Sequence, residues 1–216
     1  MVIASVEDVI FDVANALRVP VLVLAVVALG LVAAELGGMA VELVKRRRHD
    51  ARELETAAAA AAAAFGRGDT LGATATLTAV SSSSAMTDAI ERIMRHASSP
   101  TASTLIAKTL ADFDLDSLRR LERTRLLVRA GPALGLMGTL IPLSPALAGL
   151  ASGDVQELSD NLRVAFSVTV LGLLVGAIAF GISLVRDRLY AKDLSDLEFL
   201  AASIEQSRAA EQAVAT

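Results

Sequence analysis

Five of the polar side chains inside long apolar stretches of this sequence could take part in proton transfer. Four carry hydroxyl groups: Thr139, Ser144, Ser167 and Thr169. A hydroxyl both donates and accepts hydrogen bonds, so it can bond a carboxyl group in either protonation state. The fifth is Glu35, the weaker candidate, considered because a proton relay through an apolar layer needs a titratable group. These residues form the candidate proton pathway.

The same residues also have a structural interpretation. A threonine inside a helix often bonds a carbonyl of its own helix, and the spacing alone favours this at least as strongly as pore lining. Glu42 lies four residues before Arg46 and can pair with it, so we interpret Glu42 as structural. Residues 130–151 and 164–185 contain no Asp, Glu, Lys or Arg. A carboxylate that carries protons between them is therefore expected on another polypeptide.

Three apolar stretches must position these residues: 19–44, 130–151 and 164–185. Each has the ~20 residues with which a helix crosses a hydrocarbon core of about 30 Å. Hydrophobic residues make up 54% of the chain and charged ones only 20%, and the charges avoid these stretches. Buried helices of soluble proteins rarely run so far without charge. We predict an all-α integral membrane protein with three transmembrane helices and long cytoplasmic helical extensions.

Residues 1–18 precede the first stretch and carry three acidic residues but only one basic residue, Arg18. A secretory signal peptide needs a basic start, so this segment does not fit one. Its apolar residues recur at helical spacing: Val6, Val9, Ile10, Val13 and Leu17. The spacing predicts an external amphipathic helix on the membrane surface.

Basic residues gather on one side of the predicted membrane. They follow the first stretch, precede the second and follow the third, whereas residues 152–163 carry none before Arg163. The positive-inside rule then places the N-terminus outside and the C-terminus in the cytoplasm, in the cytoplasmic (inner) membrane of the cell. Residues 45–129 become a cytoplasmic helical region, 152–163 an external loop and 186–216 a cytoplasmic C-terminal helix. We interpret the arginines from 119 to 129 as a solvated helix face rather than a partner-docking surface.

The cytoplasmic region begins with strong helix formers. The first helix is expected to continue past Val44 into the alanine tract Ala57–Ala64 and to end at Gly66 and Gly68. Two serine-rich segments predict further breaks, Ser81–Ser84 and Ser98–Pro100. Alanine offers little bulk for a core, so the sequence suggests close packing of this tract on neighbouring copies of the chain.

Small residues follow one helical face in each of the last two apolar stretches. The glycines on these faces are Gly131, Gly135, Gly138, Gly172 and Gly176. Such faces let helices approach closely in lipid. We favour association between copies, a homo-oligomer, over packing of the two faces on each other within one chain. Pro142 and Pro145 lack a backbone N–H and are expected to bend the second span.

Several function classes are disfavoured by the composition. The chain has no Cys, and its only histidines, His49 and His96, lie far apart, so no metal site or cofactor is expected. A net charge of −4 gives no sign of nucleic-acid binding. The sequence shows no nucleophile with a partner base, so we do not expect an enzyme.

Two segments carry a family resemblance. Residues 131–141, GPALGLMGTLI, look like the GPLLGLLGTV signature of the MotA/TolQ/ExbB proton-channel family, and residues 162–178 are similar to its L..AL.TTA.GL..AI block. The close match covers about residues 129–185. One span before the cytoplasmic region resembles the ExbB/TolQ branch, since the MotA branch has two there. The sequence departs from the pattern at two positions. The family often has threonine or alanine where this chain has Val168, and proline where it has Ala179.

The resemblance implies a homopentamer around two single-span helices of a partner of the ExbD/TolR/MotB type. An Asp of that partner carries the proton, and Thr139 and Thr169 match family threonines that face it. Our first hypothesis is therefore a channel or stator subunit of an energy-transducing complex driven by the proton-motive force. A non-conducting membrane scaffold or signalling protein of the same fold is the alternative, and an unrelated three-span permease subunit is less consistent with the two blocks.

Overall fold

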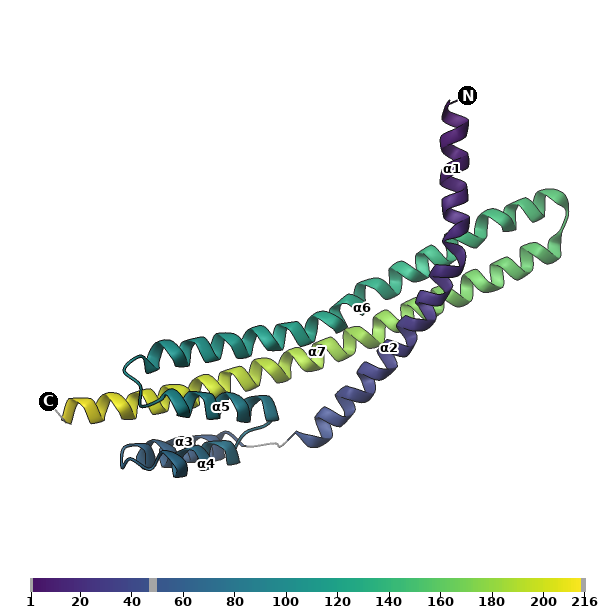
Figure 1. The fold of residues 1–216 in the computed structure, drawn as a ribbon. Helices are drawn as coiled ribbons and strands as arrows, with labels where there is room; N and C mark the ends of the chain where they lie inside the picture. The colour runs from purple at the N-terminus through teal and green to yellow at the C-terminus, as the bar shows by residue number, and fades with distance from the viewer. Residues whose placement is uncertain (1, 47–49, 215–216) are drawn as a thin grey trace. The chain divides into compact units, whose positions relative to one another are not determined.

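The computed structural model describes residues 2–46 and 50–214, and all the regular structure within them is helical (Figure 1). The helices are α1 (Val2–Ala16), α2 (Arg18–Lys45), α3 (Ala51–Phe65), α4 (Thr70–Ala79), α5 (Ser84–His96), α6 (Ala102–Ser152) and α7 (Val155–Val214). The all-α prediction is confirmed. His49, and the residues Arg47 and Arg48 among the basic residues that follow the first apolar stretch, lie outside the described residues.

Three helical segments are long and apolar enough to cross a membrane: Val9–Lys45, Ala102–Ser152 and Val155–Ala210. They contain the three stretches predicted as spans, so the prediction of three helices long and apolar enough to cross a membrane is confirmed. The chain is a multi-pass membrane protein by this criterion. Within the first segment a turn at Leu17 separates α1 from α2, where the predicted external segment was expected to end.

The chain forms two compact units, to which α2, α6 and α7 each contribute residues. The first unit consists of Met1–Met39 and Glu122–Leu184, and the second of Ala40–Leu121 and Val185–Thr216. The apolar stretches lie almost entirely in the first unit, and the helices α3, α4 and α5 lie in the second.

The first unit has a narrow core and an apolar outer surface. Val21, Ala28 and Val32 of α2 pack with buried residues of the other two long helices, Leu127, Leu134, Val175, Ala179 and Ile182. Many large apolar side chains point outward instead, among them Leu136, Leu140, Val170 and Phe180. Exposed apolar side chains on all helices of a bundle suit a lipid environment, where no hydrophobic penalty attaches to them.

The second unit has a core of its own that includes the alanine tract. Ala58, Ala61 and Ala64 of α3 are buried against larger side chains of α5 and α7, namely Met86, Ile90, Ile93, Leu197, Leu200 and Ile204. The tract thus finds the missing bulk in α5 and α7 of its own chain, and close packing on neighbouring copies stays a prediction. Beyond residue 185, α7 buries Leu197, Leu200 and Ile204 in this core.

Two predicted boundaries need correction. The first helix does not continue into the alanine tract: α2 ends at Lys45, and α3 begins after Asp50, whose extended backbone and side-chain bond to the N–H of Ala51 (2.8 Å) cap it. The loop predicted at 152–163 is also mostly helical. Only Gly153 and Asp154 separate α6 from α7, because Gly153 adopts φ +81°, favoured by glycine.

The other predicted breaks are confirmed. Gly66 caps the C-terminus of α3, and Gly68 follows it with φ +79°. Ser83 caps α5, since its hydroxyl accepts from the N–H of Met86 at 3.3 Å. Pro142 and Pro145 lie within α6, which is assigned as one helix from Ala102 to Ser152, and a bend there stays a prediction.

Candidate functional site

The glycine-lined faces of α6 and α7 pack on each other within the chain. A Cβ atom placed on Gly131 would lie 2.7 Å from the carbonyl oxygen of Gly172, and one on Gly176 would lie 2.8 Å from Cδ of Pro132. Real Cβ contacts are longer, so these positions accept only glycine unless a helix moves. Gly135 and Gly138 face Thr169 and Val168 across the same contact. We call this the α6–α7 glycine contact.

This contact corrects the argument for association between copies. The two small faces are occupied by one another, which is the alternative that the sequence argument ranked second. The glycines therefore explain how α6 and α7 approach closely, and they give no independent support for a homo-oligomer. Sequence reasoning had also passed over Pro132, whose ring meets Gly176 in this contact.

Thr169 lies at the edge of the glycine contact and joins the two helices. Its hydroxyl is 3.2 Å from the carbonyl oxygen of Gly135 on α6 and 3.1 Å from that of Ala165 on α7. A hydroxyl has a single proton, so it can donate to only one of these oxygens at a time. The side chain is half-buried, which leaves part of it open to a further partner.

Thr139 bonds its own helix. Its hydroxyl is 2.8 Å from the carbonyl oxygen of Leu136 and 3.5 Å from that of Gly135. This is the structural interpretation given for threonines above. The Gly135 carbonyl is thus within reach of both threonine hydroxyls, so Thr139 and Thr169 are brought together around one acceptor.

The remaining candidates are not brought into this contact. Ser144 and Ser167 are exposed on α6 and α7, and the Ser167 hydroxyl donates to the carbonyl of Arg163 at 2.7 Å. Glu35 is half-buried on α2. It follows Val21, Ala25, Ala28 and Val32 on the face that α2 buries, so its helix directs it toward the bundle rather than toward lipid.

Comparison with known families decides the identity of this fold. The model of the MotA/TolQ/ExbB proton channel family matches residues 81–198, more than half of the 216 residues. The chain belongs to the MotA/TolQ/ExbB proton channel family. The match is wider than residues 129–185, which carry the close sequence resemblance, and includes α5, all of α6 and most of α7. Searches of curated proteins and of solved structures gave no match.

The second unit holds a polar cluster that sequence reasoning missed. Asp193 of α7 is 2% exposed and accepts hydrogen bonds from Arg46, Ser82 and Ser83, the last at 3.2 Å. Arg46 also donates to the carbonyl of Leu189 at 3.0 Å. A signal was present in the sequence, because Asp193 precedes Leu197 and Leu200 by four and seven residues and so shares their buried face.

Glu42 extends this cluster, and its predicted pairing with Arg46 is confirmed. Its carboxylate lies 3.8 Å from Arg46 and 3.5 Å from Arg186, and it accepts a hydrogen bond from the Tyr190 hydroxyl at 3.4 Å. Burial raises the pKa of the Tyr190 hydroxyl, and the charge of Glu42 raises it further. Burial also raises the pKa of the nearby Asp196 carboxyl, against the lowering effect of Lys192.

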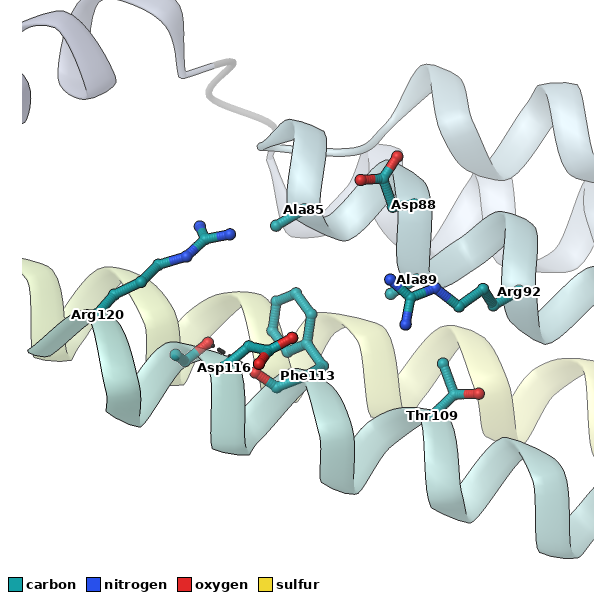
Figure 2. A pocket seen from close by; sticks show the side chains of 9 residues that line it. Ala85, Asp88, Ala89, Arg92, Thr109, Phe113, Asp116 and Arg120 are labelled. Atoms are coloured by element: carbon teal, nitrogen blue, oxygen red, sulfur yellow. Dashed lines mark hydrogen bonds between the residues drawn. The ribbon is translucent and has the colours of Figure 1, made fainter.

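A small cavity lies between α5 and α6 in the second unit (Figure 2). Its volume is about 70 Å³, and charged groups of both signs line it, among them Asp88, Arg92, Asp116 and Arg120. Figure 2 shows Arg92 of α5 and Arg120 of α6 on either side of the Phe113 ring. Such a volume accommodates a few water molecules and no larger ligand, so we assign no binding role to it.

Proposed function

We propose that the chain is the channel-forming subunit of a motor or energy-transducing complex driven by the proton-motive force. Copies of it form a ring, a pentamer by family resemblance, around the transmembrane helices of a single-span partner of the ExbD/TolR/MotB type. An Asp of that partner relays protons, and Thr169 with Thr139 faces it. The subunit is not an enzyme and needs no cofactor.

Membership of the proton channel family carries this proposal. The matched residues include both apolar stretches without titratable groups and both threonines. A proton cannot cross an apolar layer without a titratable or hydrogen-bonding route. The two stretches offer hydroxyls but no acid, which suits a ring whose carboxylate comes from another chain. The half-buried Thr169 hydroxyl, which has two alternative acceptors, can turn toward such a carboxylate.

The order of helices favours the ExbB/TolQ type over the MotA type. One apolar helix, α2, precedes the helices α3, α4 and α5, and two apolar helical stretches follow. Basic residues flank the apolar stretches on the side of α3–α5, so we place the N-terminus outside the cytoplasmic membrane and the C-terminus in the cytoplasm.

A non-conducting scaffold of the same fold is the second candidate. The observation that favours it is the bonding of the threonine hydroxyls. Both reach backbone carbonyls of their own chain, and Thr139 reaches carbonyls of its own helix. A scaffold would keep the glycine contact and the polar cluster but would need no acid from a partner.

Native mass spectrometry of the complex, purified with any co-expressed single-span partner, tests the proposal. We expect five copies of this chain with a partner whose single apolar helix carries an Asp. A structure of the same sample would then show the partner helices in the central pore. A monomer, or a ring whose lumen holds no acidic helix, would contradict the proposal.

A further inference from the structure

Asp193 contacts two segments that lie far apart in the sequence. On one side it pairs with Arg46, the residue that follows α2, and on the other it accepts from Ser82 and Ser83, which precede α5. All four residues belong to the second unit. Asp193 is thus the carboxylate through which α7 holds both the end of α2 and the start of α5.

Burial makes these bonds interdependent. The side chains of Asp193 and Arg46 are only 3% and 9% exposed, so water does little to replace a lost partner. Removing one member of a buried ion pair leaves an uncompensated charge, which is strongly unfavourable. The remaining charge then forms shorter hydrogen bonds to its other partners or moves toward water. Either change alters the geometry of the hydrogen bonds to those partners.

Ser83 links this carboxylate to the stability of α5. Its hydroxyl donates to Asp193 and its oxygen accepts from the N–H of Met86 in the first turn of α5. A hydroxyl whose proton is held by a carboxylate presents its lone pairs to the helix N–H, so Asp193 fixes the capping geometry. Arg46, in turn, fixes Asp193.

We infer that Asp193 is a joint that couples the end of α2 to the start of α5, so that a change at one alters the stability of the other. The coupling is a free energy between two sites through one shared group, and it must be reciprocal. It does not depend on the proposed channel function, because it concerns contacts within a single chain.

Amide hydrogen exchange of the full chain in detergent micelles, followed by mass spectrometry, tests the inference with Arg46→Gln, Asp193→Asn and the double variant. Asp193→Asn should speed exchange about tenfold in the peptides 40–46 and 84–90. Arg46→Gln should also speed exchange in 84–90, although its own bonds go to α7 and Glu42. In the double variant the Arg46 substitution should add little.

Asp112→Asn is the matched control, because Asp112 pairs with Lys108 on the exposed surface of α6 in the same unit. It should leave both peptides unchanged. The inference is overturned if Arg46→Gln leaves 84–90 unchanged, or if the effects of the two substitutions simply add. Should Asp193→Asn fail to fold, Ser82→Ala with Arg46→Gln forms a milder cycle, in which additive effects would again overturn the inference.

Discussion

The hydroxyl of Thr169 lies 3.2 Å from the carbonyl oxygen of Gly135, and this bond joins α7 to α6 beside their glycine contact. The same hydroxyl has Ala165 as a second acceptor on its own helix. Thr169 therefore has two hydrogen-bonding choices within the chain, while part of the side chain is exposed. Its structural role and its proposed role at a proton path are compatible.

The glycine contact predicts that Gly172→Ala destabilises the chain. The new Cβ would lie 2.8 Å from Cα of Gly135, so α6 and α7 must move apart, at a cost of about 1–3 kcal/mol. Gly181→Ala is the matched control on the same helix, since no atom lies within 4 Å of its added Cβ, and it should be neutral or slightly stabilising. Thermal unfolding in detergent measures both. Equal midpoints for the two variants would show that the contact is not close.

Removing the hydrogen bond between Arg18 and Asn161 should loosen the first unit. Arg18 donates to the side-chain oxygen of Asn161 at 2.7 Å, and Asn161 is 6% exposed. Asn161→Ala should lower the free energy of unfolding by about 1–2 kcal/mol, because a buried bond to a charged group is lost. Gln156→Ala, at an exposed site with longer bonds to Asp160, should cost far less. A double-mutant cycle with Arg18→Gln that gives no coupling energy would contradict this assignment.

The raised pKa of Asp196 predicts that the free energy of unfolding depends on pH. Burial raises the pKa of this carboxyl in the folded chain, so folding favours its protonated form. The stabilisation from the bound proton is full below the unfolded pKa of about 4 and is lost as the pH rises through the higher folded pKa. Asp196→Asn should therefore raise the unfolding midpoint at pH 7, with a gain that shrinks toward pH 4. If Asp196→Asn raised the unfolding midpoint equally at every pH, the raised pKa of Asp196 would not be the cause.

The sequence predicted the spans well because their signal is local. The composition of an apolar run such as 164–185 is enough to predict a helix long enough to cross a membrane. A helix end can be predicted from Ser83 or Gly66 because these residue types form the capping hydrogen bonds themselves. The loop at 152–163 was predicted too long, because its acidic residues gave no sign of a helix. In the structure only Gly153 and Asp154 form the turn, and α7 begins at Val155.

The partners of buried faces could not be predicted in the same way. The spacing of Gly131, Gly135 and Gly172 shows that something packs closely on each helix but does not say which helix. The contact of Asp193 with Arg46 joins residues 147 apart, and nothing in either local pattern identifies the other. The placement of Thr139 and Thr169 around one carbonyl likewise depends on the contact between two helices.

Proton flux into liposomes that contain the complex of this chain with its partner, followed with an internal pH-sensitive dye, is the most direct measurement of the proposed function. Thr169→Val keeps the shape of the side chain but removes the hydroxyl, so flux should fall at least about tenfold while the complex stays assembled. Thr169→Ser keeps the hydroxyl and should retain most of the flux. Undiminished flux through an assembled Thr169→Val complex would contradict the role assigned to Thr169, and no flux through the unmodified complex would contradict the channel itself.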